Sequence, residues 1–125
     1  MIVEESAIRA LLDQHWAAPT SGDIYAEDVV VDFPQSGEQM RGRANLVAQR
    51  SAQPDAPKVA NVLRITGSGA LWISEVVITY DGKPWNTVNI HEFRGDKIIH
   101  ETQYFAEPFA PAAWRSPWVV HSAIA

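Results

Sequence analysis

The chain has 125 residues, of which 46% are hydrophobic and 20% are charged, and its formal net charge is −5. This length is typical of one domain that buries a core of its own, so we predict a single domain over residues 1–125. The lack of cysteine excludes disulfides and thiolate-bound metals. The acidic balance argues against a nucleic-acid partner, and no apolar run is long enough to predict a membrane partner. Because the N-terminus is acidic, unlike a signal peptide, we expect a cytoplasmic protein.

The first half of the chain alternates predicted helices with one strand. Residues 5–18 are predicted as a helix, because Ile8, Leu11, Leu12 and His15 fall on one face of a 3.6-residue period. The β-branched run within residues 28–33 predicts a strand that ends at Pro34. Residues 35–42 are polar and predicted as a loop, residues 43–51 as a short helix, and residues 53–57 as a linker.

The second half predicts four antiparallel strands, over residues 58–66, 71–80, 84–94 and 97–105. A glycine-rich turn at residues 67–69 separates the first two strands. Asp81-Gly82 and Gly95-Asp96 then give two tight hairpins. Residues 108–125 form a proline- and tryptophan-rich tail, which we expect to pack on the core or on a partner.

Two-residue turns would fix the pairing of these strands. Around Gly95-Asp96, Glu101 would oppose Ile90 and Gln103 would oppose Val88, while around Asp81-Gly82, Glu75 would oppose Val88. One face would then be aliphatic and bury against the helices, with three polar side chains, Glu75, Glu101 and Gln103, around Val88 and Ile90. The other face would expose Trp72, Ile78 and Tyr104, together with His91 and His100, and would pair with a second copy.

The polar side chains on the aliphatic face, together with His15 on the helix, are the candidate site. Apolar surroundings disfavour a charged carboxylate and raise its pKa, which suits acid–base work. The alternatives are purely structural roles: His15 would be a core histidine, and both glutamates would be paired with arginine, lysine or backbone groups. His91 and His100 lack an obvious third ligand, so we predict no metal site and no cofactor.

Three stretches carry a resemblance to a known family: residues 22–34 (GDIYAEDVVVDFP), residues 41–43 (RGR) and residues 93–98 (FRGDKI), which run on to Tyr104-Phe105. With the order of elements, they resemble the nuclear transport factor 2-like superfamily, in its SnoaL-like branch. The resemblance covers residues 5–107. It implies an α+β, cystatin-like fold in which a cone-shaped, curved antiparallel sheet wraps around N-terminal helices. It also implies a pocket between sheet and helices and a homodimer through the sheet.

The resemblance implies positions for the catalytic groups of related enzymes. The general-base aspartate of ketosteroid isomerases would fall on Phe33, their oxyanion-binding aspartate on Ile90, and their oxyanion tyrosine on His15. Residues 103–106, where polyketide cyclases carry an aspartate, contain no acidic side chain. A steroid-isomerase mechanism is therefore not predicted.

We predict that the protein binds a small, mostly apolar molecule in the pocket. If it is an enzyme, we expect proton-transfer chemistry such as isomerisation, dehydration, cyclisation or hydrolysis. His15 would be the donor or base, Glu101 or Glu75 its partner, and Gln103 would orient the substrate. The remaining ligand-binding residues would be Tyr25, Phe33, Val88, Ile90 and Phe105. The alternative is a non-catalytic ligand-binding or dimerisation module.

Overall fold

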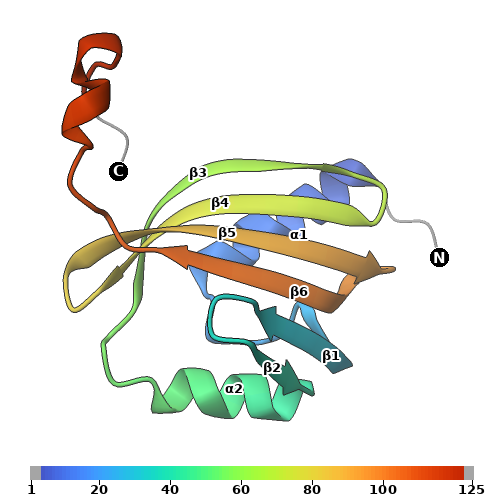
Figure 1. Ribbon diagram of the computed structural model, residues 1–125. Helices are drawn as coiled ribbons and strands as arrows, with labels where there is room; N and C mark the ends of the chain where they lie inside the picture. Colours follow the sequence, from blue (N-terminus) through green and yellow to red (C-terminus); the bar gives the residue numbers. More distant parts are fainter. Residues whose placement is uncertain (1–3, 123–125) are drawn as a thin grey trace.

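The computed structural model describes residues 4–122 and joins two helices to a curved sheet (Figure 1). The elements in chain order are α1 (Glu5–Ala17), β1 (Tyr25–Phe33), β2 (Glu38–Arg41), α2 (Arg43–Ala52), β3 (Lys58–Ser68), β4 (Leu71–Tyr80), β5 (Lys83–Arg94), β6 (Lys97–Ala106) and the 3₁₀ helix η1 (Ala113–Trp118). Within the described residues, no helix is both long enough and apolar enough to cross a membrane.

The sheet places its strands in the order β2-β1-β6-β5-β4-β3. The pairs β3–β4, β4–β5 and β5–β6 are antiparallel, as predicted, and β1 joins the edge of β6 in parallel. Figure 1 shows α1 against one face of the long strands and α2 beside β1 and β2. We call the face of β3–β6 toward α1 the inner face and the opposite face the outer face. This α+β architecture agrees with the predicted fold class.

The helix α1 forms because its apolar positions recur at helical spacing and point toward the sheet. Ile8, Leu12 and His15 are buried, as the periodicity predicts, and Trp16 is buried beside them. The helix ends where the Ala18 amide donates to the carbonyls of Gln14 and His15, just before a proline that cannot continue it. The core lies between the two helices and the sheet, β1 included; its buried members are Ile8, Leu12, Ile24, Tyr25, Val29, Val31, Leu46, Trp72, Phe93 and Ile98.

Two predicted boundaries are wrong in the first half. The first strand begins at Tyr25 rather than at residue 28. Residues 35–42 are not all loop, because Glu38–Arg41 form β2, which pairs antiparallel with β1. A turn closed by the Gly37 amide donating to the Phe33 carbonyl brings the two strands together. The short edge strand β2 buries little, so its sequence carries no apolar alternation to reveal it.

The register between β5 and β6 differs from the predicted one. At the turn Arg94 pairs with Lys97, as a two-residue loop requires, but the pairs then become Phe93–Ile98 and Glu92–His100. Ile99 is therefore the extra residue of a β-bulge, which shifts the remaining pairs by one. Successive side chains of a strand point to opposite faces of the sheet. A shift of one residue in the pairing therefore places the side chains of one strand on the opposite face relative to those of its partner.

As a result, the predicted faces of β4 and β5 are exchanged, while β6 keeps its predicted face beyond the bulge. The register across Asp81-Gly82 is confirmed, including Glu75 opposite Val88. The pairs predicted across the other turn are wrong: Glu101 opposes His91, and Gln103 opposes Asn89. The inner face carries Trp72, Ser74, Val76, Ile78, Thr87, Asn89, His91, Phe93, Ile98, Glu101, Gln103 and Phe105.

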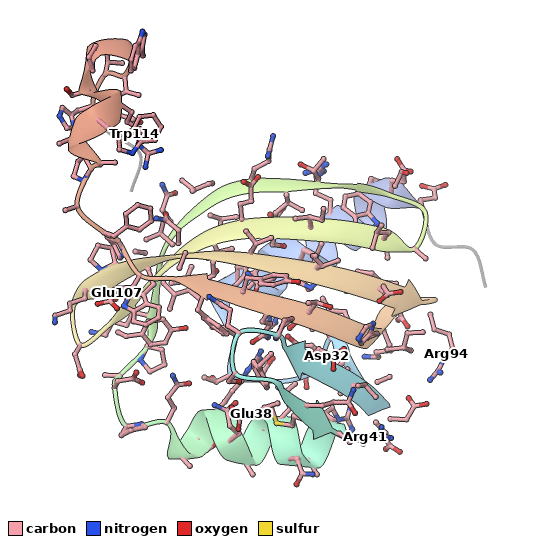
Figure 2. The ribbon with its side chains drawn as sticks, viewed as in Figure 1. Asp32, Glu38, Arg41, Arg94, Glu107 and Trp114 are labelled. Carbon is pink, nitrogen blue, oxygen red and sulfur yellow. The ribbon has the colours of Figure 1, made fainter. Side chains whose placement is uncertain are left out.

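The C-terminal segment after β6 stands away from the rest of the molecule (Figure 1). We call residues 107–122 the arm. Phe109, Trp114 and Trp118 are between 76% and 82% exposed, and Figure 2 shows Trp114 far from Asp32 and Glu38 of the domain. The tail is predicted to pack either on the core or on a partner. The arm does not pack on the core of its own copy. Residues 123–125 of the predicted tail lie outside the described residues.

Candidate functional site

A cavity of about 620 Å³ opens between the helices and the inner face of the sheet. Its wall has side chains from the end of α1 and the loop after it, from β1, β2 and the turn between them, from α2 and the linker after it, and from β3–β6. The lining comprises Trp16, Pro19, Thr20, Phe33, Gln35, Ser36, Glu38, Gln49, Arg50, Gln53, Asp55, Pro57, Lys58, Val59, Ile78, Tyr80, Trp85, Asn89, Gln103 and Phe105. Phe33 and Phe105 stack with their ring centroids 6.3 Å apart. A volume of this size suits a small organic ligand.

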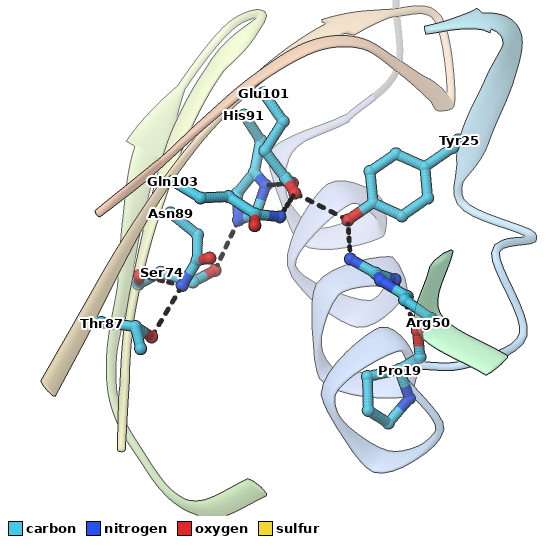
Figure 3. Close-up of polar contacts among 9 residues, drawn as sticks. All are labelled: Pro19, Tyr25, Arg50, Ser74, Thr87, Asn89, His91, Glu101 and Gln103. Carbon is cyan, nitrogen blue, oxygen red and sulfur yellow. Dashed lines mark hydrogen bonds and ion pairs between the residues drawn. The ribbon is translucent and has the colours of Figure 1, made fainter. Parts of the chain in front are cut away.

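Glu101 is the centre of a buried polar network beside this cavity (Figure 3). Its Oε2 accepts hydrogen bonds from the Tyr25 hydroxyl at 2.7 Å and from Nε2 of Gln103 at 2.5 Å. Its Oε1 is bonded to Nδ1 of His91. Burial alone would raise the pKa of Glu101, but His91 and then Arg50 lower it to about 2. Glu101 is therefore an ionised acceptor whose two oxygens are already occupied.

Arg50 of α2 extends the network toward the cavity. Its Nη2 donates to the Tyr25 hydroxyl oxygen at 2.9 Å, and its Nη1 donates to the Pro19 carbonyl at 2.6 Å. Burial raises the pKa of Tyr25 well above its ordinary value, and Glu101 adds to the effect, so Tyr25 stays a neutral donor. Burial would lower the pKa of Arg50, yet the oxygens of Tyr25 and Glu101 raise it, so the guanidinium stays charged.

His91 links Glu101 to Ser74 on the neighbouring strand. A carboxylate only accepts, so Nδ1 of His91 carries the proton of that bond, and Nε2 lies 2.8 Å from Oγ of Ser74. This order of atoms matches a Ser-His-acid triad. Ser74 is fully buried, however, and neither it nor His91 lines the cavity. The geometry therefore fits a positioning chain rather than a nucleophile.

His15 lies next to this network but makes no hydrogen bond to the described residues. Its ring meets that of Tyr25 edge-on, with centroids 5.5 Å apart, and packs against Trp16. Neither ring nitrogen has a partner within residues 4–122. Burial lowers the pKa of His15 to about 4 despite the opposing effect of Glu101, so the ring is neutral at pH 7. Unlike Trp16, His15 does not line the cavity.

The structure brings together only part of the predicted site. His15, Tyr25, Glu101 and Gln103 meet in one buried region, and Phe33 and Phe105 line the cavity beside them. The other three residues, Glu75, Val88 and Ile90, lie on the outer face, contrary to the predicted placement.

Glu75 forms an ion pair with Arg64 of β3 at the surface of the sheet. Its separation from Glu101 follows from the exchanged faces, because Glu75 opposes the outward-facing Val88. Of the two predicted acid–base glutamates, only Glu101 is on the side of the helices.

Sequence reasoning missed Arg50, Asn89 and His91. On β5, Asn89 and His91 alternate with two more inner residues, Thr87 and Phe93. The sequence therefore places these four residues together on one face of the sheet, but it predicts that face as the outer one. Only the bulge at Ile99 reveals which side they take, and a single sequence gives no signal for it. Arg50 sits in the last turn of α2, where its contact with Tyr25 depends on tertiary packing. The described residues contain no group of three or more histidine or acidic side chains arranged to hold a metal ion.

An α+β cone with a cavity between helix and curved sheet defines the class of this protein. A crystal structure of an NTF-2 like protein of unknown function from Burkholderia xenovorans is 48% identical, with a TM-score of 0.83; the match covers 95% of this chain and 98% of that chain. The chain therefore belongs to the nuclear transport factor 2-like family.

Two further solved structures show the same fold at lower identity. A protein provisionally called a ketosteroid isomerase, from Kribbella flavida, is 21% identical with a TM-score of 0.84, covering 95% of this chain and 92% of that chain. A hypothetical protein with a ketosteroid isomerase-like fold from Catenulispora acidiphila, in complex with trimethylamine, is 19% identical with a TM-score of 0.62, covering 79% and 85%. No family model matches the sequence, and the search of curated proteins finds no match.

Proposed function

We propose that this protein binds a small, mostly apolar molecule in the cavity between α1, α2 and the inner face of the sheet. The observation that carries the proposal is the cavity itself, about 620 Å³, whose wall combines aromatic and aliphatic side chains with polar groups from several elements. Ligand sites in proteins have volumes in this range and use polar groups to orient the ligand. The protein from Catenulispora acidiphila, which has the same fold, is in complex with trimethylamine, and this gives further support because a protein of this fold binds a small organic molecule.

Binding has more support than proton transfer among the functions that the sequence predicts. None of the three predicted acid–base residues, His15, Glu75 and Glu101, belongs to the cavity lining. Glu101, with a pKa lowered to about 2, is a weak base whose oxygens are already hydrogen-bonded. The carboxylates that do line the cavity are Glu38 and Asp55. A ligand-binding module is therefore the function that we carry forward.

The test uses a cavity-filling substitution and a matched control on the same strand. Ile78 lines the cavity, whereas Ile73 lies on the outer face. We expect Ile78→Trp to weaken binding of indole, measured by calorimetry, at least tenfold, and Ile73→Trp to leave it unchanged. Equal affinity in both variants, or no binding of indole or 1-methylindole to the unaltered protein, would contradict the proposal.

We also propose that two copies associate through the outer face of the sheet and the arm. The outer face carries Ile73, Val88 and Ile90, with Tyr104 and Leu71 exposed on it. Within the described residues of one copy no helix covers this aliphatic surface (Figure 1), and the arm presents three further exposed aromatic side chains, Phe109, Trp114 and Trp118. A second copy is the partner whose own outer face and arm match these surfaces in chemistry and size.

A further inference from the structure

The amide of Gln103 has only one orientation compatible with its partner. Its Nε2 lies 2.5 Å from Oε2 of Glu101, an ionised carboxylate oxygen that can only accept. The NH₂ group must therefore face Glu101, which leaves Oε1 on the other side of the amide. Oε1 has no hydrogen-bond partner in the part of the chain that the structure describes, and Gln103 lines the cavity.

The amide of Asn89 is fixed by the same reasoning. Its Nδ2 donates to the Ser74 carbonyl at 3.3 Å, and a carbonyl cannot donate in return. It also donates to Oγ1 of Thr87 at 3.1 Å, whose own proton goes to the Val76 carbonyl. The oxygen Oδ1 of Asn89 is therefore left without a partner among residues 4–122, on another residue that lines the cavity.

These two oxygens are neighbours on adjacent strands. Asn89 and Gln103 pair directly across β5 and β6, and both side chains point to the inner face (Figure 3). Neither oxygen is among the fully buried side-chain atoms without a partner, so both are open to the cavity, where a ligand can reach them. A ligand that brings a hydrogen-bond donor between them would satisfy both.

The charge of the neighbouring groups selects the kind of donor. The Arg50 guanidinium also lines the cavity and is held charged by Tyr25 and Glu101. The lining also contains a second cation, Lys58, and two carboxylates, Glu38 and Asp55, so its formal charges balance. The cavity therefore favours a neutral donor over an ammonium group.

We propose that the ligand is a neutral, mostly apolar molecule whose O–H or N–H group donates to the paired oxygens of Asn89 and Gln103. The proposal rests on the proposed function and assigns to these two residues the choice among apolar molecules of similar shape. A site built around a hydrogen bond rejects analogues that lack the donor, because its buried polar atoms are then left unpaired.

The experiment compares indole with 1-methylindole, which differ in one N–H donor, by calorimetry on the full chain. We expect indole to bind about tenfold more tightly to the unaltered protein. In Gln103→Met the ratio should fall to about threefold or less, and in the control Thr102→Val, on the outer face of the same strand, it should stay near tenfold. If Gln103→Met does not fold, the ratio on the unaltered protein still decides.

The possible failures are distinguishable. If both probes bind the unaltered protein equally and Ile78→Trp abolishes binding, the cavity binds apolar molecules but the donor proposal is wrong. If neither probe binds, or if binding survives Ile78→Trp, the proposed function itself is contradicted. A tenfold ratio that persists in Gln103→Met removes Gln103 from the donor site.

Discussion

At the scale of single residues, Glu75 and Glu101 show how one residue type takes two different roles. Both are glutamates within long strands of the same sheet, Glu75 in β4 and Glu101 in β6. Glu101 is fully buried and accepts from three donors, whereas Glu75 pairs with Arg64 on the outer face. Because Glu101 is buried, water cannot replace a partner that it loses, whereas water can reach Glu75.

We predict that Glu101→Gln destabilises the protein by about 3–5 kcal/mol. The amide would turn an NH₂ group toward donors that now bond a carboxylate oxygen, and Arg50 would lose the nearby negative charge. Chemical denaturation followed by circular dichroism measures the free energy of unfolding. The control Glu75→Gln, on the outer face, should cost much less because its ion pair is partly solvated. Equal losses in the two variants would mean that the buried network adds no particular stability.

His100 gives a pH-dependent prediction on the outer side of the sheet. Its Nε2 lies 2.6 Å from Asp32 and its Nδ1 bonds Glu92. The hydrogen bond to Asp32 is the main cause that raises the pKa of His100 above 6.5, and the same bond lowers the pKa of Asp32 below 3.8. The contribution of His100 is therefore full below pH 6.5 and is lost as the pH rises through the raised pKa.

We expect the unaltered protein to unfold at a higher temperature than His100→Gln at pH 5–6, with the difference shrinking above pH 7. Thermal melts from about pH 2 to pH 9 measure it. As the pH falls through the lowered pKa of Asp32, the difference should shrink again, because the carboxylate becomes neutral. A difference that is constant over the whole range would show that the ion pairs of His100 do not contribute to stability.

At the scale of elements, the bulge at Ile99 sets which side chains of β6 face the cavity. The bulge lies between the pairs Phe93–Ile98 and Glu92–His100, close to the turn. Beyond it, Glu101 and Gln103 face inward together with His91 and Asn89. Without the extra residue, continuous pairing from the same turn would place Glu101 on the opposite side of β6 relative to β5.

We predict that deleting Ile99 prevents the native fold, whereas Ile99→Ala, which keeps the extra residue, leaves it intact. The deletion would break the network between Glu101 and His91 and leave buried donors unpaired. Circular dichroism and thermal melts of the two variants measure the outcome. A cooperative melt of the deletion variant at the temperature of the unaltered protein would contradict the role given to the bulge.

At the scale of the whole molecule, the arm and the outer face share one feature, exposed apolar surface. Phe109, Trp114 and Trp118 are each more than three-quarters exposed. Large aromatic side chains bury roughly 150–250 Å² each when covered. Three of them together would bury about 450–750 Å², which is more than half of the roughly 800 Å² that each partner gives to a standard interface.

We predict that the full chain is dimeric at micromolar concentration and that a chain ending at Ala106 is a folded monomer. Removal of the arm takes away Phe109, Trp114 and Trp118, which are largely exposed within one copy. Sedimentation velocity at several concentrations measures the mass, and circular dichroism checks that the short chain is folded. As a control, Trp114→Ser with Trp118→Ser should weaken the dimer without shortening the chain. A monomeric full chain would contradict the proposed association.

The sequence by itself determined the elements that depend on local patterns. The period of α1, the stops at Pro34 and after Ala52, and the turns at Asp81-Gly82 and Gly95-Asp96 are all encoded within a few residues, and the resemblance to the nuclear transport factor 2-like family followed from them. The edge strand β2 was not predicted, because a polar strand pairs through its backbone and leaves no pattern of apolar side chains in the sequence.

The tertiary structure alone decided which face is inside. The more aliphatic face of β4 and β5 is the outer one, and the polar residues Ser74, Asn89 and His91 are buried because each finds a hydrogen-bond partner there. Hydrophobicity predicts the buried face of a sheet from the side chains of its own strands. The burial of a polar group depends instead on hydrogen-bond partners from distant segments, such as Tyr25 and Arg50. The one-residue bulge at Ile99 then determines that Glu101 and Gln103 of β6 share this buried face with His91 and Asn89.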